Sequence, residues 1–263
     1  MRPIVLKLGG SAITDKTKTC TPNVDVIQHS ISQIAEYEGP LVLLHGGGSF
    51  AHPFVQRVAL HKGYRGPFQL VAVSETELYL DQLTRIVGAA LLSKKIPFVP
   101  IRPMNFITLR KDRTMNCFLD PMKLALDLGL VPLMHGDLAF DNSGGVGVLS
   151  ADHLASFLGV KLGASRVLFG CDVGGVYSQD PRVSSNARLV EVVTKENHRS
   201  VLEMVAKHPS TDATGGMFSK VAEAVRAARL GVESIIFDVT KGDLLGNVLK
   251  HRRIVGTRFV PWG

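Results

Sequence analysis

The feature that most constrains this chain is a short apolar run that ends at three consecutive glycines. Residues 40–44, Pro-Leu-Val-Leu-Leu, have the length and composition of a strand buried on both faces. His45-Gly-Gly-Gly-Ser49 follows directly, with His52 four residues after the last glycine. Because glycine has no Cβ, an anion can approach these backbone amides closely, and His52 can add a side-chain donor. The pattern predicts a strand followed by a phosphate-binding turn; a tight turn without a ligand is the alternative.

Composition limits the class of protein. The chain has 263 residues, 45% of them hydrophobic, which suits one large α/β domain or two fused lobes. Its formal charge is +7, which leaves a nucleic-acid binder open, but no basic block is interleaved with aromatic residues, and small polyanionic ligands explain the positive charge equally well. The three cysteines are widely spaced and suggest neither a disulfide framework nor a zinc site. No apolar segment reaches the ~18 residues of a membrane span, and we expect a cytoplasmic protein.

The strand-then-glycine theme recurs along the chain. A strand is predicted over residues 3–8, and Lys7 interrupts its apolar pattern just before Gly9-Gly10, at the edge where open parallel sheets bind ligands. Further elements follow from apolar periodicity and turn residues. Strands are predicted over residues 97–101, 130–134, 146–149, 165–170 and 232–239, a hairpin over 106–119, and helices over 23–37, 68–92 and 120–128 and from about 150 and 217 onward.

Polar residues gather at three of these strand ends. Gly136 lies in a second turn able to expose backbone amides, and Asp152 lies in the first turn of a helix, where it either satisfies amides or orients lysines. Tyr177 offers a flat ring after the strand over 165–170. In the same loop Gly175 makes a tight turn, and Asp172 and Asp180 offer acceptors suited to ribose or amino groups.

The last glycine pair opens a helix. Gly215 and Gly216 precede Met217, and Lys220 lies one turn inside, which makes a good anion site. Two familiar nucleotide motifs are absent, since neither GxxxxGK[ST] nor GxGxxG after a strand occurs. Several separate loops and lysines must therefore hold any phosphates. Lys16, in a polar loop, is by default a solvated residue.

Taken together, the motifs resemble the ordered set of the amino-acid kinase superfamily. They are Lys7-Leu-Gly-Gly-Ser11, His45-Gly-Gly-Gly-Ser-Phe-Ala-His52, Gly136-Asp137, Ser150-Ala-Asp152, Asp172-Val-Gly-Gly-Val-Tyr177 with Asp180, and Thr214-Gly-Gly-Met217 with Lys220. Within it the chain most resembles the isopentenyl phosphate kinases, through Ile13-Thr-Asp-Lys16 and the histidine at position 52. Ala51 and Ala151 stand where that branch more often has glycine, and neither change removes a charge.

The resemblance implies a fold and an activity. The fold is an α/β three-layer αβα sandwich around a mostly parallel sheet, with residues 1–163 as a phosphate-acceptor lobe and 164–263 as a nucleotide-binding lobe of one compact unit. The activity is ATP-dependent phosphorylation of isopentenyl phosphate to isopentenyl diphosphate, a step of isoprenoid biosynthesis. ATP is then the co-substrate, Mg²⁺ bridges its phosphates with few or no protein ligands, and the protein is expected to form a homodimer.

The resemblance also implies roles for individual residues. Catalytic roles go to Lys7, Lys16, His52, Asp152 and Lys220. Acceptor binding goes to Gly9, Gly10, Gly47, Gly48, His52 and Gly136. Nucleotide binding goes to Lys7, Asp172, Gly175, Tyr177, Asp180, Gly215, Gly216, Met217 and Lys220. No residue is expected to bind a metal directly.

The acceptor's apolar tail needs a pocket without polar groups. Candidates are Phe68, Val73, Leu80 and Met134, although each is typical of an ordinary core as well. Two other functions stay open. One is a related kinase for a different acceptor, such as fosfomycin, a carbamate or an acylamino acid. The other is a non-catalytic nucleotide sensor, which the joint presence of Lys7, Lys16 and Lys220 argues against.

Overall fold

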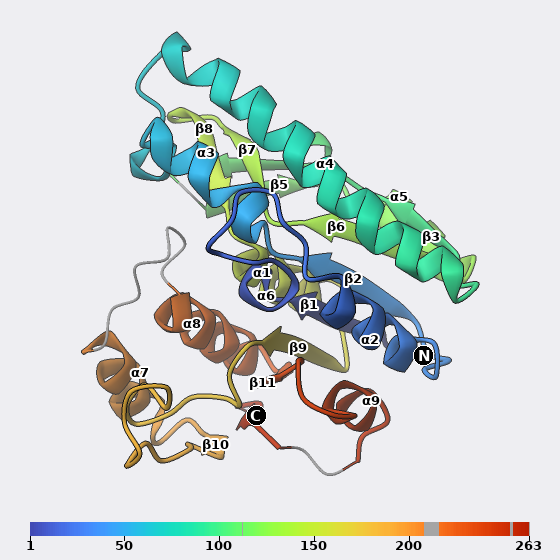
Figure 1. Cartoon of the computed structure of the whole chain (residues 1–263), viewed down its shortest axis with the longest axis vertical. Coiled ribbons are helices and arrows are strands. Elements are labelled where there is room, and N and C mark those ends of the chain that lie inside the picture. The colour runs from blue at the N-terminus through green and yellow to red at the C-terminus, as the bar shows by residue number, and fades with distance from the viewer. Residues whose placement is uncertain (112, 208–215, 253–254, 263) are drawn as a thin grey trace.

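An eight-stranded sheet forms the centre of the computed structural model, which describes residues 1–111, 113–207, 216–252 and 255–262 (Figure 1). Its order is β10-β12-β11-β9-β1-β2-β6-β3, and only the β11–β12 pairing is antiparallel. The strands are β1 Ile4–Leu8, β2 Leu41–His45, β3 Phe98–Pro100, β6 Val131–His135, β9 Arg166–Cys171, β10 Val192–Val193, β11 Glu233–Asp238 and β12 Thr257–Phe259. The expectation of a mostly parallel sheet is confirmed.

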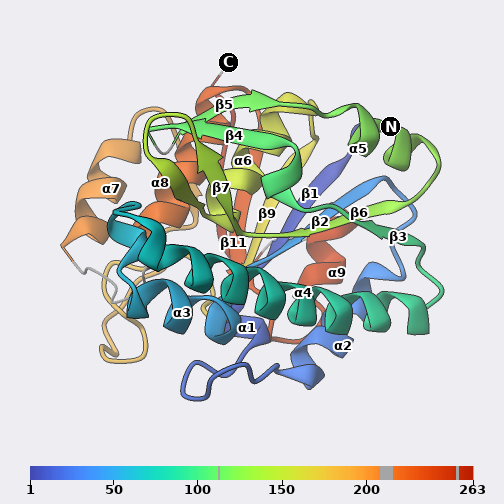
Figure 2. The same cartoon turned by 90° about the horizontal axis from the view of Figure 1, so that it is seen from above.

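Helices cover both faces of this sheet, which gives the expected three layers (Figure 2). Helices α2 Val24–Ile34, α4 Leu70–Ser93 and α9 Leu244–Leu249 pack on one face, with the short α1 Gly10–Ile13. Helices α5 Asp120–Asp127, α6 Ala151–Lys161, α7 His198–Ala206 and α8 Gly216–Arg229 pack on the other. Strand β1 shows why both faces need to be covered: its side chains point alternately to one face and the other, and apolar side chains lie on both. Leu6 packs with the first group of helices, and Val5 and Lys7 face the second.

The helix boundaries follow local signals. The Asn23 side chain caps α2, as predicted, by accepting a hydrogen bond from the Val26 amide. The helix ends at Ile34, three residues earlier than predicted, because the chain tightens there and the Tyr37 amide bonds back to Ile34. Ser150 caps α6 by accepting from the His153 amide at 3.1 Å. This cap sets the first turn of α6, which carries Asp152.

A second, four-stranded sheet stands apart from the first, and the sequence predicted only the hairpin over 106–119 and the strand over 146–149. Its order is β5-β4-β7-β8, with strands β4 Ile107–Arg110, β5 Arg113–Cys117, β7 Asp137–Asp141 and β8 Gly145–Leu149. The chain passes from β6 to β7 at Gly136, where a Cβ would lie 2.6 Å from the Ala151 amide nitrogen. Glycine therefore permits the turn by which the backbone leaves the large sheet beside α6.

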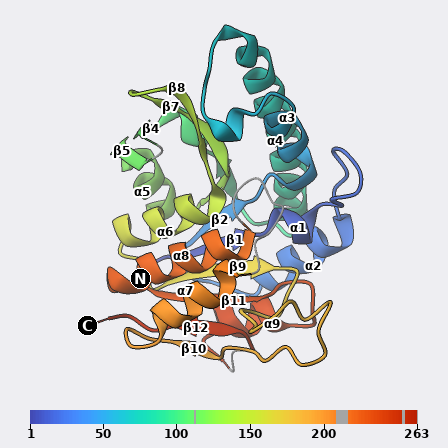
Figure 3. The same cartoon turned by 90° about the vertical axis from the view of Figure 1, so that its left-hand side faces the viewer.

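The second sheet and the pair α3 His52–Arg57 and α4 extend from the same end of the large sheet (Figure 3). Short 3₁₀ turns connect the surrounding elements at Gly48–Phe50, Leu60–Lys62, Pro67–Gln69 and Pro103–Asn105. The large sheet runs without a break from β1 to β9, so residues 1–163 and 164–263 share it. Among the described residues, no helix is both long and apolar enough to cross a membrane.

Candidate active site

A cavity of about 630 Å³ opens at the carboxyl edge of the large sheet. Its walls come from the ends of β1, β2, β6 and β9 and from the first residues of α3, α6 and α8. Parallel strands bring these ends together although they lie far apart in the sequence. All five residues predicted to be catalytic line the cavity: Lys7, Lys16, His52, Asp152 and Lys220.

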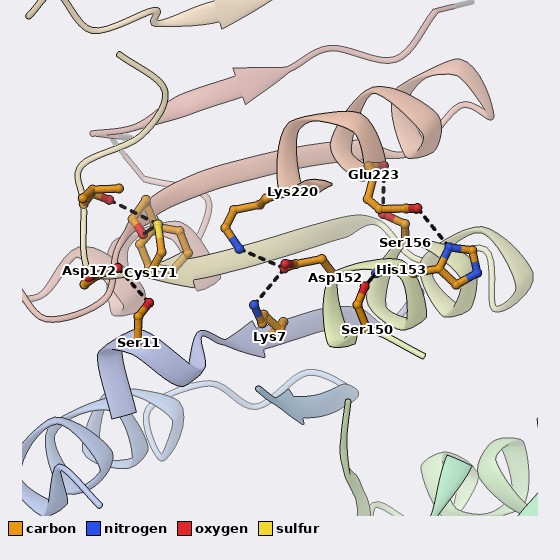
Figure 4. Close-up of polar contacts among 12 residues, drawn as sticks. Lys7, Ser11, Ser150, Asp152, His153, Ser156, Cys171, Asp172, Lys220 and Glu223 are labelled. Atoms are coloured by element: carbon orange, nitrogen blue, oxygen red, sulfur yellow. Dashed lines mark hydrogen bonds and ion pairs between the residues drawn. The ribbon is translucent and has the colours of Figure 1, made fainter. Parts of the chain in front are cut away.

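A buried carboxylate joins two of the lysines (Figure 4). Lys7 Nζ donates to Asp152 Oδ1 at 2.8 Å, and Lys220 Nζ donates to the same oxygen at 2.9 Å. The three side chains come from β1, α6 and α8, and each residue is only 6% exposed. Two ammonium groups and one carboxylate leave a net positive charge at the cavity wall. Because water is largely excluded there, this charge attracts a phosphate more strongly than a surface lysine does.

The ionisation of this cluster follows from burial and mutual charge. Burial opposes the charge on Asp152, but the Lys220 and Lys7 ammonium groups outweigh it and hold the pKa of this carboxyl well below its usual range. Burial lowers the pKa of Lys7 to about 8. At Lys220 burial again acts to lower the pKa, but the Asp152 carboxylate and the neighbouring Cys171 and Lys7 together outweigh it, and the pKa is raised. Asp152 is therefore too weak a base to take a proton from a substrate, and its contacts suit it to holding the lysines.

Two further catalytic candidates lie on segments close to this cluster. Lys16 is exposed on a turn after α1, and the Asp15 carboxylate orders that turn by accepting from the Thr17 amide at 2.9 Å. His52 is the first residue of α3 and is half-buried at the cavity wall. Both residues face the same cavity as Lys7.

The two glycine turns pack backbone against backbone. A Cβ at Gly10 would lie 2.5 Å from the Gly48 amide nitrogen, and one at Gly48 would lie 2.1 Å from Thr14 Oγ1. Gly48 also has a φ of +49°, which favours glycine. The Thr14 hydroxyl joins the turns by donating to Gly10 O at 2.6 Å and accepting from the Ser49 amide at 3.1 Å. The sequence analysis did not identify Thr14 as a functional residue. The one indication in the sequence is that its hydroxyl lies four residues after Gly10, the spacing at which it can bond to the Gly10 carbonyl oxygen.

Three of the four glycines predicted to supply amides lie at the cavity. Gly10, Gly47 and Gly48 line it, and their amides donate to no other group in the described part of the chain. Gly9 does not line it, because its amide extends the sheet by donating to Gly170 O at 2.7 Å. Gly136 lines the cavity, but its amide donates to His45 O at 2.9 Å.

The opposite end of the cavity carries the residues predicted to bind a nucleotide. Gly175, Tyr177, Asp180, Gly216 and Met217 line it together with Asp172. Gly215 lies outside the described residues. The Ser11 hydroxyl donates to Asp172 Oδ1 at 2.8 Å, which ties this loop to α1 (Figure 4). Arg182 and Lys207 also line this end and were missed, since neither follows a glycine turn.

The apolar end differs from the prediction. Neither Phe68 nor Val73 lines the cavity: Phe68 precedes α4 and is 67% exposed, and Val73 packs against a small core cluster that includes Leu60 and Val146. Met134 is buried in the main core. Leu80, the remaining tail candidate, does line the cavity. It shares that wall with Ala51, Val55, Thr76, Leu138 and Val148, none of which was predicted.

Comparison with known proteins agrees with this geometry. The profile of the amino acid kinase family matches residues 2–238. The isopentenyl phosphate kinase of Methanothermobacter thermautotrophicus is 31% identical over 97% of this chain and 98% of its own length. That of Methanocaldococcus jannaschii is 27% identical over 82% and 84%. A solved isopentenyl phosphate kinase structure superposes with a TM-score of 0.85 at 28% identity, covering 98% of this chain and all of that one. The chain therefore belongs to the amino acid kinase family, in its isopentenyl phosphate kinase branch.

Proposed function

We propose that this protein transfers the γ-phosphoryl group of ATP to isopentenyl phosphate, giving isopentenyl diphosphate and ADP. The observation that carries the proposal is the single cavity shared by Lys7, Lys16, Lys220 and His52, with Asp152 between two of the lysines. The names of the relatives in the same branch point to the same acceptor. In this proposal residues 1–163 form most of the acceptor site and residues 164–263 most of the nucleotide site; both ranges contribute side chains to the cavity.

The reaction needs little acid–base help. A phosphate monoester has a second pKa near ~6, so its oxygens are already ionised at neutral pH. One of these oxygens attacks the γ-phosphorus of ATP, a new P–O bond forms, and the bond to the β-phosphate oxygen breaks as ADP leaves. No proton has to move. Catalysis must therefore come from alignment of the two phosphates and from neutralisation of their charge.

The lysines supply the neutralising charge. Lys7 and Lys220 face the transferring group, and Asp152 holds both ammonium groups in place before the substrates arrive. Such prearranged charges cost no reorganisation during the reaction. Lys16 reaches the same space from its loop. The amides of Gly10, Gly47 and Gly48 add donors for phosphate oxygens.

His52 selects the acceptor. Its position at the start of α3 places the imidazole at the cavity wall, close in sequence to the glycine turn. A ring N–H can donate to the acceptor phosphate, and the apolar wall that includes Val55, Leu80 and Val148 can receive the isopentenyl tail. An acceptor with a carboxylate in place of the tail would meet apolar side chains there, which disfavours acylamino acids.

Magnesium enters with the nucleotide. In the described residues, no three His, Cys, Asp or Glu side chains converge to hold a metal ion. The cavity carboxylate of Asp152 is already bonded to two lysines. The donor set therefore fits Mg²⁺ that is carried by the ATP phosphates, so MgATP is the substrate.

The oligomeric state and the cellular location of the protein are part of the same proposal. We expect a cytoplasmic homodimer, in keeping with the family resemblance. Sedimentation velocity of the purified protein measures the assembly directly, and a single species at the monomer mass of 28.4 kDa would contradict it.

Replacement of His52 tests the function. We expect His52→Ala to lower kcat/KM for isopentenyl phosphate by at least about 10²-fold, since the acceptor phosphate loses a charge-assisted donor. MgATP affinity, measured by calorimetry, should stay unchanged, and His52→Gln, which keeps a donor, should recover part of the activity. The wild-type enzyme should show no comparable turnover of fosfomycin, carbamate or acetylglutamate. Full activity in His52→Ala would refute the named acceptor.

A further inference from the structure

Of the side-chain contacts that join helices α6 and α8, one belongs to the lysine cluster and the others do not. Asp152 on α6 accepts from Lys220 on α8 at 2.9 Å. His153, the next residue on α6, bonds to Glu223, one turn further along α8. The Ser156 hydroxyl donates to the Glu223 backbone oxygen at 2.8 Å. Figure 4 shows the three contacts side by side between the two helices.

His153 is held on both ring nitrogens. Its Nδ1 lies 2.9 Å from Glu223 Oε1, and its Nε2 lies 3.1 Å from Thr114 Oγ1 on β5. A carboxylate only accepts, so Nδ1 carries the proton that is shared with Glu223. In the neutral ring Nε2 then accepts from the Thr114 hydroxyl. Arg226, also on α8, has Nη1 3.2 Å from Nδ1 and 4.0 Å from Glu223 Oε1. A guanidinium only donates, so with Nδ1 protonated Arg226 pairs with the Glu223 carboxylate and makes no hydrogen bond to the ring.

This contact is not part of the cavity wall. Neither His153 nor Glu223 lines the cavity, and their side chains are 13% and 16% exposed. His153 directly follows Asp152, and Glu223 lies three residues after Lys220, so a shift of α8 relative to α6 would move both contacts together. The pair therefore has no access to substrate and can influence the reaction only through its neighbours.

The lysine cluster needs such support. Lys7 and Lys220 donate to one and the same oxygen, and their like charges repel each other. A single shared acceptor does not determine how far apart two repelling ammonium groups lie. The His153–Glu223 contact can determine this, because it joins the side chain next to Asp152 to the side chain one turn after Lys220.

We propose that His153 and Glu223 are positioning residues that fix the Lys220 ammonium group against Asp152 for phosphoryl transfer. The inference rests on the proposed function, because it assigns Lys220 to the transferring phosphate. The pair does not contact the substrate itself. Through the hydrogen bond between His153 and Thr114, it also connects α6 to β5 of the second sheet. A displacement of about 1 Å in a catalytic group is enough to lower a rate by up to about 10²-fold.

Replacement of His153 tests the proposal against a matched control. We expect His153→Ala to lower kcat about tenfold and to weaken MgATP binding several-fold, with KM for isopentenyl phosphate unchanged, because His52 lies on a different helix. His153→Asn, whose amide can reach Glu223 from the Nδ1 position, should keep most of kcat. Ser156→Ala removes a hydrogen bond at the same helix contact but leaves the pair intact, and should lower the melting temperature without changing kcat.

A double-mutant cycle separates positioning from general loosening. In a Lys220→Ala background, His153→Ala should change the residual kcat by less than about twofold, since the group it positions is gone. An equal tenfold loss in both backgrounds would overturn the proposal, and so would an equal loss of kcat in Ser156→Ala. If His153→Ala fails to fold, Glu223→Ala removes the same contact from the other side and replaces it in the cycle.

The measurements also separate this inference from the proposed function. If the wild-type protein does not phosphorylate isopentenyl phosphate, the proposed function fails. MgATP affinity by calorimetry still tests the positioning role, since it needs no acceptor. Weaker MgATP binding in His153→Ala but not in Ser156→Ala supports that role, and equal affinity in all three proteins overturns it.

Discussion

The two ends of the cavity are built in different ways. At the phosphate end, charged side chains and backbone are tied to each other before any ligand binds: Lys7 and Lys220 share Asp152, and Thr14 bridges the two glycine turns. At the apolar end, the wall is made mostly of aliphatic side chains from α3, α4, β7 and β8, among them Val55, Leu80 and Val148. The difference matches what each end has to do.

Phosphoryl transfer requires charges that are already in place, because reorganising them during the reaction would raise the barrier. A hydrocarbon tail requires only space and the exclusion of water, and several combinations of side chains can provide both. We therefore expect changes at the phosphate end to cost far more activity than changes at the apolar end. Four predictions, from the largest effect to the smallest, test this contrast.

Replacement of Asp152 should have the largest effect. Asp152→Asn leaves two buried ammonium groups without a counter-charge, and loss of one partner of a buried ion pair typically costs about 3–5 kcal/mol of folding free energy. We also expect kcat to fall by about 10²–10³-fold, since both lysines lose their anchor. Thermal unfolding and steady-state kinetics measure the two effects.

An exposed ion pair provides the control for Asp152. Lys123 lies 3.7 Å from Asp120 on the surface of α5, and Lys123→Ala should change stability by less than about 1 kcal/mol and leave kcat unaltered. If Asp152→Asn changed stability and kcat as little as Lys123→Ala does, the phosphate end would not be a prearranged charge cluster. The proposed difference between the two ends of the cavity would then be wrong.

Replacement of Gly48 should have the second-largest effect. At φ +49° an alanine is strained by about 1–2 kcal/mol, and its Cβ would overlap Thr14 Oγ1 and approach Gly10 O at 2.7 Å. The two glycine turns must then move apart, and we expect kcat/KM to fall by about 10²-fold. Gly144→Ala is the matched control, because a Cβ there meets nothing within 4 Å. Equal kinetics for the two variants would show that the turns tolerate displacement.

The same contrast explains what the sequence could predict. At the phosphate end, Lys7 and Lys220 were noticed because each lies beside a glycine turn at a strand end or a helix start, where an anion can bind. The catalytic role of Asp152 and the mostly parallel sheet came from the family resemblance, while apolar runs such as residues 40–44 predicted individual strands. Gly9 shows the limit of this reasoning: its type fits an anion site, but its amide is used by the sheet.

The apolar end could not be predicted in the same way. Any aliphatic residue on α4 satisfies the chemistry, so the choice depends on how the helix is rotated and where it begins. Phe68 falls in the 3₁₀ turn before α4, and Val73 packs one turn short of the cavity, whereas Leu80 reaches it. The second sheet, which contributes Leu138 and Val148, depends on a change of direction at Gly136 that no periodicity signals.

The third prediction concerns pH. The pKa of Lys7 is lowered to about 8, so the residue is protonated below that pH and loses its charge above it. The free enzyme's attraction for phosphate should therefore be complete below pH 8, and kcat/KM for MgATP should fall about tenfold per pH unit above it. The substrate phosphates titrate near ~6 and do not contribute to this limb. Lys7→Arg should be less active, but its kcat/KM should not fall above pH 8, because a guanidinium stays protonated. A profile that is flat to pH 10 would contradict the role of Lys7.

The smallest effect should come from the apolar end. Leu80→Val removes one methylene from the cavity wall, and a buried methylene is worth about 0.8 kcal/mol, which corresponds to roughly a fourfold rise in KM for isopentenyl phosphate. We expect kcat to stay the same, because the tail is bound equally well before and during phosphoryl transfer. Phe68→Ala removes a larger side chain that lies outside the cavity and should leave KM unchanged. If Phe68→Ala raised KM as much as Leu80→Val, the tail would lie along the exposed start of α4. If Leu80→Val instead lowered kcat by a factor comparable to Gly48→Ala, the apolar wall would take part in alignment, and the two ends of the cavity would not be separable in function.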